Sequence, residues 1–214
     1  MTDDVNKLVE HFFLPYRLQK YRQGQVLILN GDSPGQIYYL LSGRVKVYDV
    51  SYRGDEIIIN TFQPPAFFPM SLAINPGTSS FIYEAETDIE VRQAPIDVVL
   101  AFIQEHPEVT YDLLSRVYRG TDGLLGRMVY LMAGSAQSRL IFELTQEARR
   151  FGTMDGNQYS IGISEKDLGA KTGLSRETVN RELHKLKKQG FIEVHNKGLI
   201  IKDFSGLVSK LAAE

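Results

Sequence analysis

The stretch Ser164–Gly190 reads SEKDLGAKTGLSRETVNRELHKLKKQG, which is the pattern of two short helices joined by a tight turn. Gly173 stands where the first helix must end, because a residue without a Cβ accepts the positive φ that such a turn needs. Ser164 and Ser175 are suited to cap the helix that follows each of them, and Asp167 can complete a capping box with Ser164. The stretch therefore predicts a helix, a turn and a second helix.

The second helix has two chemically different faces when its residues are placed about 100° apart around the axis. One face is apolar and consists of Val179, Leu183 and Leu186. The other face carries side chains that can hydrogen-bond to the edges of DNA bases, because arginine reads guanine and glutamate accepts from the cytosine amino group. Its members are Arg176, Glu177, Asn180 and Arg181. This arrangement predicts a DNA recognition helix, and a surface helix with solvated charges is the alternative.

The residues after this helix favour the DNA-binding interpretation. Residues 191–201 alternate in polarity around Asn196-Lys197-Gly198, as a β-hairpin does. A helix-turn-helix followed by a hairpin is a winged helix. Lys187 and Lys188 are then candidates for contacts with DNA phosphates.

Composition excludes several classes of protein. The chain has 214 residues, no cysteine and four scattered histidines, so we expect no disulfide, no metal and no cofactor. No apolar run approaches the roughly 18 residues of a membrane span. The acidic N-terminal residues lack the apolar core of a secretory signal, so the sequence predicts a cytoplasmic protein without membrane contact.

Charge is distributed unevenly along the chain. Residues 1–135 carry 11 basic and 16 acidic side chains, for a net charge of −5, whereas residues 136–214 carry 13 and 10, for a net charge of +3. The basic part contains the predicted recognition helix, where positive charge is needed for contact with phosphates.

The first half of the chain predicts a small β domain. Between Tyr16 and Ala94, short segments rich in β-branched and aromatic residues alternate with glycine turns, which is typical of a barrel or roll. The segments are 25–29, 36–41, 44–50, 56–60 and 90–92. We expect helices at 3–14, 95–104, 107–132, 136–151 and 204–214. The predicted class is α+β, with a β-roll at 1–106, a dimerisation helix and hinge at 107–135, and a winged helix at 136–214.

The predicted helix over 107–132 has an apolar stripe that suits a coiled-coil seam. Its members are Val109, Leu113, Val117, Leu124, Met128 and Leu131. We expect this stripe to pair two copies of the chain, and burial within one chain is the alternative. Gly120, Gly123 and Gly126 interrupt the helix, and each costs about 1 kcal/mol relative to alanine. They indicate either a kink or close helix contact, or a helix poised between loose and ordered states.

The sequence resembles the cyclic-AMP receptor protein/fumarate–nitrate regulator (Crp/Fnr) superfamily of bacterial transcription factors over nearly its whole length. The resemblance rests on the glycines of the β region, on Arg139 and on the motif LSRETVNREL. The glycine positions are Gly24, Gly31-Asp32, Gly43 and Gly54. It implies a homodimer that binds a palindromic site on double-stranded DNA and contacts RNA polymerase. It also implies that Arg176, Glu177 and Arg181 read a TGTGA-like half-site. By the same resemblance, Ser175 contacts a DNA phosphate.

The effector region departs from the family's cyclic-AMP-binding members. Those members carry Gly-Glu and, about ten residues later, Arg-Ser, whereas this chain has Phe67-Phe68-Pro69-Met70 and Ser79-Ser80. A desolvated phosphate without an arginine is costly, so the sequence predicts that cyclic AMP is not the effector. We expect either an apolar or aromatic effector or a filled, purely structural β-roll. The candidate lining residues are Phe67, Phe68, Met70, Ser71, Ser79, Ser80, Ile82, Leu124, Leu125 and Met128.

Three functions are compatible with these features of the sequence. The first is a ligand-responsive transcription regulator, and the second is a regulator of the same fold without an effector. The third is an enzyme with an added DNA-binding domain. The sequence contains no nucleophile–base signature, metal spacing or phosphate loop, so we expect no enzymatic activity and no catalytic residue.

Overall fold

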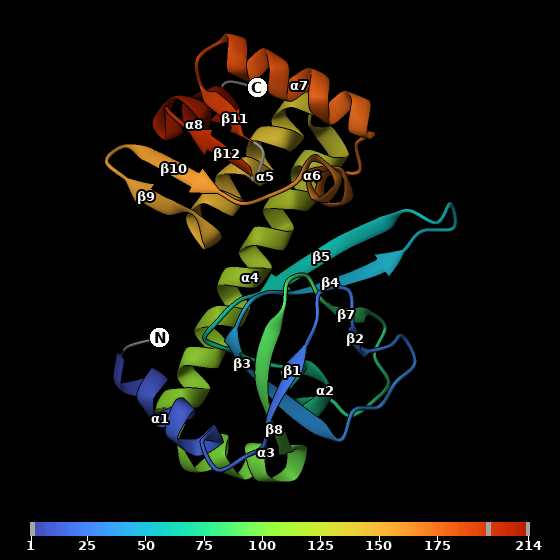
Figure 1. The fold of residues 1–214 in the computed structure, drawn as a ribbon, viewed down its shortest axis with the longest axis vertical. Helices are drawn as coiled ribbons and strands as arrows, with labels where there is room; N and C mark the ends of the chain where they lie inside the picture. Colours follow the sequence, from blue (N-terminus) through green and yellow to red (C-terminus); the bar gives the residue numbers. More distant parts are fainter. Residues whose placement is uncertain (1–2, 196–197, 213–214) are drawn as a thin grey trace. The chain divides into compact units, whose positions relative to one another are not determined.

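The computed structural model describes residues 3–195 and 198–212. The chain divides into two compact units, Met1–Tyr118 and Arg119–Glu214, and each is described by itself. Helix α4 (Pro107–Ala133) contributes residues to both units (Figure 1).

The first unit is a β-roll with helices at its ends. Its two four-stranded sheets have the orders β1-β8-β3-β6 and β2-β7-β4-β5, and all neighbouring strands are antiparallel. The helices are α1 (Asp3–Phe13), α2 (Met70–Ile74) and α3 (Ile96–Glu105). The strands are β1 (Leu18–Tyr21), β2 (Val26–Ile28), β3 (Gln36–Ser42), β4 (Val45–Val50), β5 (Glu56–Phe62), β6 (Ala66–Phe68), β7 (Ile82–Ala85) and β8 (Ile89–Pro95).

Two apolar clusters stabilise this unit. One lies between the sheets and includes Leu40 and Phe68, both fully buried. The other packs α1 and α3 against the first sheet and includes Phe13 and Phe67. Successive residues of a strand point to opposite faces, so β6 supplies one aromatic ring to each cluster.

The turn between β3 and β4 requires glycine. Gly43 has a φ of 80°, and a Cβ at this position would lie 2.7 Å from Thr87 Oγ1 and would also meet the Asp88 carbonyl. A side chain here would therefore force the turn apart.

The second unit is a winged helix with an additional hairpin. Beside the end of α4 it contains α5 (Ala136–Phe151), α6 (Glu165–Thr172), α7 (Arg176–Lys188) and α8 (Phe204–Ala212). Its antiparallel sheet has the order β11-β12-β10-β9. The strands are β9 (Thr153–Asp155), β10 (Gln158–Ile161), β11 (Ile192–His195) and β12 (Gly198–Ile201).

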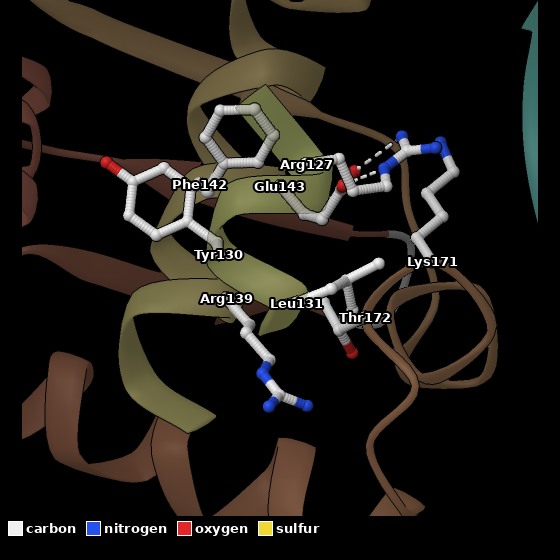
Figure 2. Close-up of a pocket in the computed structure, with 8 residues that line it drawn as sticks. All are labelled: Arg127, Tyr130, Leu131, Arg139, Phe142, Glu143, Lys171 and Thr172. Carbon is white, nitrogen blue, oxygen red and sulfur yellow. Dashed lines mark hydrogen bonds and ion pairs between the residues drawn. The ribbon is translucent and has the colours of Figure 1, made fainter. Parts of the chain in front are cut away.

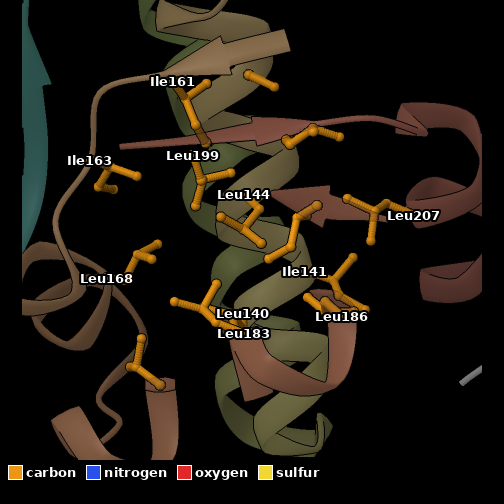
Figure 3. Packing of buried hydrophobic residues seen from close by; sticks show 14 residues of the cluster. Leu140, Ile141, Leu144, Ile161, Ile163, Leu168, Leu183, Leu186, Leu199 and Leu207 are labelled. Atoms are coloured by element: carbon orange, nitrogen blue, oxygen red, sulfur yellow. The ribbon is translucent and has the colours of Figure 1, made fainter. Parts of the chain in front are cut away.

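A single apolar core joins the elements of this unit (Figure 3). Leu140, Ile141 and Leu144 of α5 are fully buried at its centre. Leu183 and Leu186 attach α7 to the same core. Fully burying a leucine contributes roughly 1.5–3 kcal/mol, so this core fixes the direction in which the opposite face of α7 points.

Helix α4 runs without a break through its three glycines. At Gly126 a Cβ would lie 2.9 Å from Phe142 Cζ of α5, whereas a Cβ at Gly120 would meet open space. The predicted helix over 107–132 is therefore confirmed as one continuous helix, and Gly126 allows the close helix contact that belongs to the first of the two alternatives.

The α+β class, the β-roll, the long helix and the winged helix are confirmed. The predicted strand at 90–92 extends over the whole of β8. The sequence analysis did not anticipate β1, β6, β7, α2 or the β9–β10 hairpin. Most of the predicted turn at Asn196-Lys197-Gly198 lies outside the described residues. None of the helices in the described ranges is both long and apolar enough to cross a membrane.

Candidate nucleic-acid interface

The turn between α6 and α7 has the geometry that its sequence predicts. Ser164 caps α6 by accepting a hydrogen bond from the Asp167 amide at 3.1 Å, and its hydroxyl donates to the Asp167 carboxylate at 2.5 Å. Gly173 ends α6 in the left-handed region, with a φ of 66°. Ser175 then caps α7 by accepting from the Thr178 amide at 3.3 Å. The cap residues thus set the angle between the two helices.

One face of α7 is buried and the other faces solvent. Val179 and Leu186 have no exposed surface, and Leu183 is 3% exposed. The candidate DNA-contacting residues are all exposed, namely Ser175, Arg176, Glu177, Asn180, Arg181, Lys187 and Lys188. His184 is exposed as well, and its position about one turn after Asn180 and Arg181 places it on their face. The sequence analysis missed His184, although helical periodicity would have found it.

Glu182 of α7 is a buried carboxylate next to this exposed face. Glu182 is 3% exposed, and it accepts hydrogen bonds from Lys185 at 2.8 Å and from Gln137 of α5 at 3.3 Å. Arg181 Nε lies 3.4 Å from the same carboxylate. Burial alone would raise the pKa of Glu182, but the hydrogen bonds from Lys185 and Arg181 hold this pKa below its usual value. Glu182 therefore stays ionised near neutral pH and contacts the Nε atom of the Arg181 guanidinium.

A second carboxylate, on α6, contacts the exposed face of α7. We call this face, which carries Arg176, Glu177, Asn180 and Arg181, the reading face. Glu165, the first residue of α6, accepts a hydrogen bond from Asn180 Nδ2 at 3.1 Å through its Oε1 atom. Its Oε2 atom lies 3.6 Å from Arg176 Nε. The sequence analysis did not identify Glu165, because it depends on a contact between residues 15 positions apart.

Ion pairs connect α5 with the helices on either side of it. Arg127 of α4 pairs with Glu143, and its Nη2 atom lies 3.1 Å from Glu143 Oε2 (Figure 2). Lys171 of α6 pairs with Glu147, and both side chains are 5% exposed. The pocket in Figure 2, beside these pairs, has no room for a water molecule. It is therefore a packing junction and not a ligand site.

The candidate effector residues of the β-roll lie in different environments. Phe68 is fully buried and stacks on Tyr38, Phe62 and Tyr83, with centroid distances of 5.6, 5.0 and 5.8 Å. Phe67 belongs to the other cluster, beside Phe13. The two phenylalanine rings therefore do not face one common cavity.

Two of the three serine candidates, Ser71 and Ser79, use their hydroxyls in hydrogen bonds within the fold. The buried Ser79 hydroxyl donates to the Phe81 carbonyl at 2.7 Å. The Ser80 carbonyl accepts from Asn30 Nδ2 at 3.2 Å. Burial raises the pKa of Tyr83, and a hydrogen bond with Ser71 partly offsets this rise.

The remaining candidates are partly or largely exposed. Met70 of α2 and Ile82 of β7 are half-buried. Leu124, Leu125 and Met128 of α4 are 44%, 55% and 54% exposed, and they belong to the second unit. Within the described part of the chain, no three histidine or acidic side chains are grouped as metal ligands would be.

Comparisons with known proteins match both units. A model of the cyclic nucleotide-binding domain matches residues 18–106, and a model of the Crp-like helix-turn-helix domain matches residues 138–209. The CRP-like cAMP-activated global transcriptional regulator of Mycobacterium tuberculosis is 24% identical over 195 residues, covering 89% of this chain and 86% of that protein.

Solved structures share the fold. A mutant of CooA from Carboxydothermus hydrogenoformans has a TM-score of 0.79 at 20% identity, covering 94% of this chain and 90% of CooA. The c-di-GMP responsive global regulator CLP of Xanthomonas campestris has a TM-score of 0.76 at 18% identity, covering 91% of this chain and 98% of CLP.

A β-roll followed by a long helix and a winged helix with an exposed basic face defines a DNA-binding transcription regulator. The two domain models occur in this order and together cover most of the chain. The chain therefore belongs to the Crp/Fnr family of transcription regulators, a family of regulators and not of enzymes.

Proposed function

We propose that the protein acts as a homodimer that binds a palindromic, TGTGA-like DNA site through α7 and is controlled by a small apolar or aromatic effector other than cyclic AMP. The observation that supports DNA binding is the exposed face of α7. Its apolar side is fixed in the core, and its arginines, glutamate and asparagine project outward. We also propose that the DNA-bound homodimer contacts RNA polymerase, as the Crp/Fnr resemblance implies.

The surface of α4 supports the homodimer. Leu124 and Met128 of its apolar stripe are 44% and 54% exposed within one chain, whereas Val109 at the start of the stripe is buried. A contiguous apolar strip of this kind is characteristic of an interaction surface. Two copies paired along it would present two α7 helices to successive major-groove segments, roughly 34–36 Å apart.

The chemistry of the β-roll supports an effector without phosphate. Met70 and Ile82 are half-buried apolar side chains in this region, whereas Ser79 already uses its hydroxyl within the fold. Solved relatives of this fold are described with different ligands, since CLP is called c-di-GMP responsive and CprK was solved in complex with OCPA. A change of effector chemistry within the fold is therefore reasonable.

We expect cyclic AMP to bind weakly or not at all, because residues 67–70 and 79–80 provide no arginine for its phosphate. Isothermal titration calorimetry of the full-length protein with cyclic AMP measures this directly. A dissociation constant in the micromolar range would contradict the expectation.

The alternative is a regulator whose β-roll is purely structural. It is favoured by Phe68, which fills the space between the sheets and stacks on three aromatic rings. Strong specific binding of DNA by the purified, ligand-free protein would support this alternative over the effector-gated regulator.

The proposed function is tested by titrating DNA containing an inverted TGTGA repeat against the same DNA with one half scrambled. Each mismatched base pair costs roughly 1–3 kcal/mol, so the scrambled DNA should bind far more weakly. Fluorescence anisotropy gives both affinities. Equal affinity for the two DNAs would contradict the proposed function.

A further inference from the structure

Glu165 contacts two of the side chains that α7 presents to solvent. One carboxylate oxygen accepts from Asn180 Nδ2 at 3.1 Å, and the other lies 3.6 Å from Arg176 Nε. The Glu165 side chain is 29% exposed and that of Arg176 is 82% exposed. Glu165 is therefore the more buried partner of this pair.

The contact with Glu165 fixes which way the Asn180 amide faces. An ionised carboxylate only accepts hydrogen bonds, so Asn180 must turn its Nδ2 atom toward Glu165. Its carbonyl oxygen Oδ1 is then directed away from Glu165. In the major groove, a carbonyl oxygen accepts from the exocyclic amino groups of adenine and cytosine, whereas guanine and thymine offer acceptors at the corresponding positions.

The same carboxylate changes the electrostatics of the reading face. Contact with phosphates is favourable for any DNA sequence, and it strengthens with each positive charge on the protein surface. Glu165 places a negative charge beside Arg176 and so weakens that sequence-independent attraction. Base contacts then account for a larger share of the binding free energy.

From these two contacts we infer that Glu165 is a specificity-determining residue of the DNA site. It positions Asn180 to select adenine or cytosine over guanine or thymine at one base position of each half-site, and it limits non-specific binding by partly neutralising Arg176. This inference rests on the proposal that α7 reads DNA, and it adds a residue of α6 to the determinants of sequence preference.

The test compares the base preferences of the full-length wild-type, E165A and N180A proteins on a library of half-sites randomised one position at a time. N180A identifies the position that Asn180 reads. At this position E165A should lose a preference of roughly fivefold or more for adenine or cytosine, because its Asn180 amide is free to rotate. If E165A kept the wild-type preference at that position, the positioning role of Glu165 would be wrong.

The charge effect is measured separately. E165Q and E165A should both bind random DNA more tightly at low salt, and the slope of log affinity against log salt should steepen by up to about 0.9 per subunit. E165Q keeps the side-chain length, so it supplies this measurement if E165A is unstable. An unchanged slope in E165Q would overturn the proposed effect on Arg176.

Asp155 provides a matched control for net charge. It is an exposed acidic residue on β9, in the same unit but on a different element from the reading face. D155A should leave base preference unchanged at every position. If the wild-type protein showed no half-site preference, the proposed function itself would be wrong. If the wild-type protein bound specifically and E165A had the same base preferences and the same salt dependence, only the role of Glu165 would be wrong.

Discussion

Replacing Arg181 with alanine should weaken specific DNA binding by roughly 1–3 kcal/mol per half-site and should relax the preference at one base position. Arg181 is exposed on the reading face, and its Nε atom lies 3.4 Å from the buried Glu182 carboxylate. This contact orients the guanidinium through its Nε atom, and the two Nη atoms are the donors that suit bidentate contact with guanine. The effect is measured as the ratio of affinities for the selected site and for random DNA.

Two observations separate this effect from general damage. The folded domain should keep its stability, because Glu182 retains hydrogen bonds from Lys185 and Gln137 in the variant. K188A serves as the matched control, since loss of a phosphate contact weakens all sequences alike and reduces the salt slope by about one. If R181A lost the same free energy on specific and random DNA, the base-reading role of Arg181 would be wrong.

Replacing Leu124 with arginine should dissociate the proposed dimer and abolish binding to a palindrome. Leu124 is 44% exposed on the apolar stripe of α4. In a paired helix the substitution would bury two like charges against each other, and an unpaired buried charge costs several kcal/mol. Analytical ultracentrifugation should show the mass of one chain for the variant and of two chains for the wild type.

The control for this variant is Y118R. Tyr118 lies on the same helix and is 64% exposed, but it is about 120° around the axis from the centre of the stripe. Y118R should remain dimeric and bind DNA as the wild type does. A dimeric L124R protein would show that α4 does not form the interface through this stripe.

Local signals in the sequence were sufficient to predict the helix-turn-helix. Serine caps at 164 and 175, together with a glycine at 173, specify where the helices begin and end. The apolar face of α7 was predicted correctly because its period follows the helix. The β9–β10 hairpin was missed because all three residues of β9 are exposed, so it lacks the alternation that indicates a half-buried strand.

Contacts between distant residues could not be read from the sequence in the same way. Glu165 looked like an ordinary acidic residue of a first helical turn, and only the packing of α6 on α7 brings it to Asn180. Phe67 and Phe68 are neighbours in sequence, but the pleat of β6 sends them into separate clusters. The effector-binding role of the candidate residues in the β-roll and in α4 stays a prediction.

The central claim is that two copies of α7 read a two-fold symmetric DNA site. Selection of bound sequences from random DNA by the full-length protein tests this claim most directly. The expected result is an inverted repeat whose half-sites resemble TGTGA and are centred roughly 34–36 Å apart, one turn of the double helix. Recovery of a single asymmetric site, or of no preferred sequence, would contradict the claim.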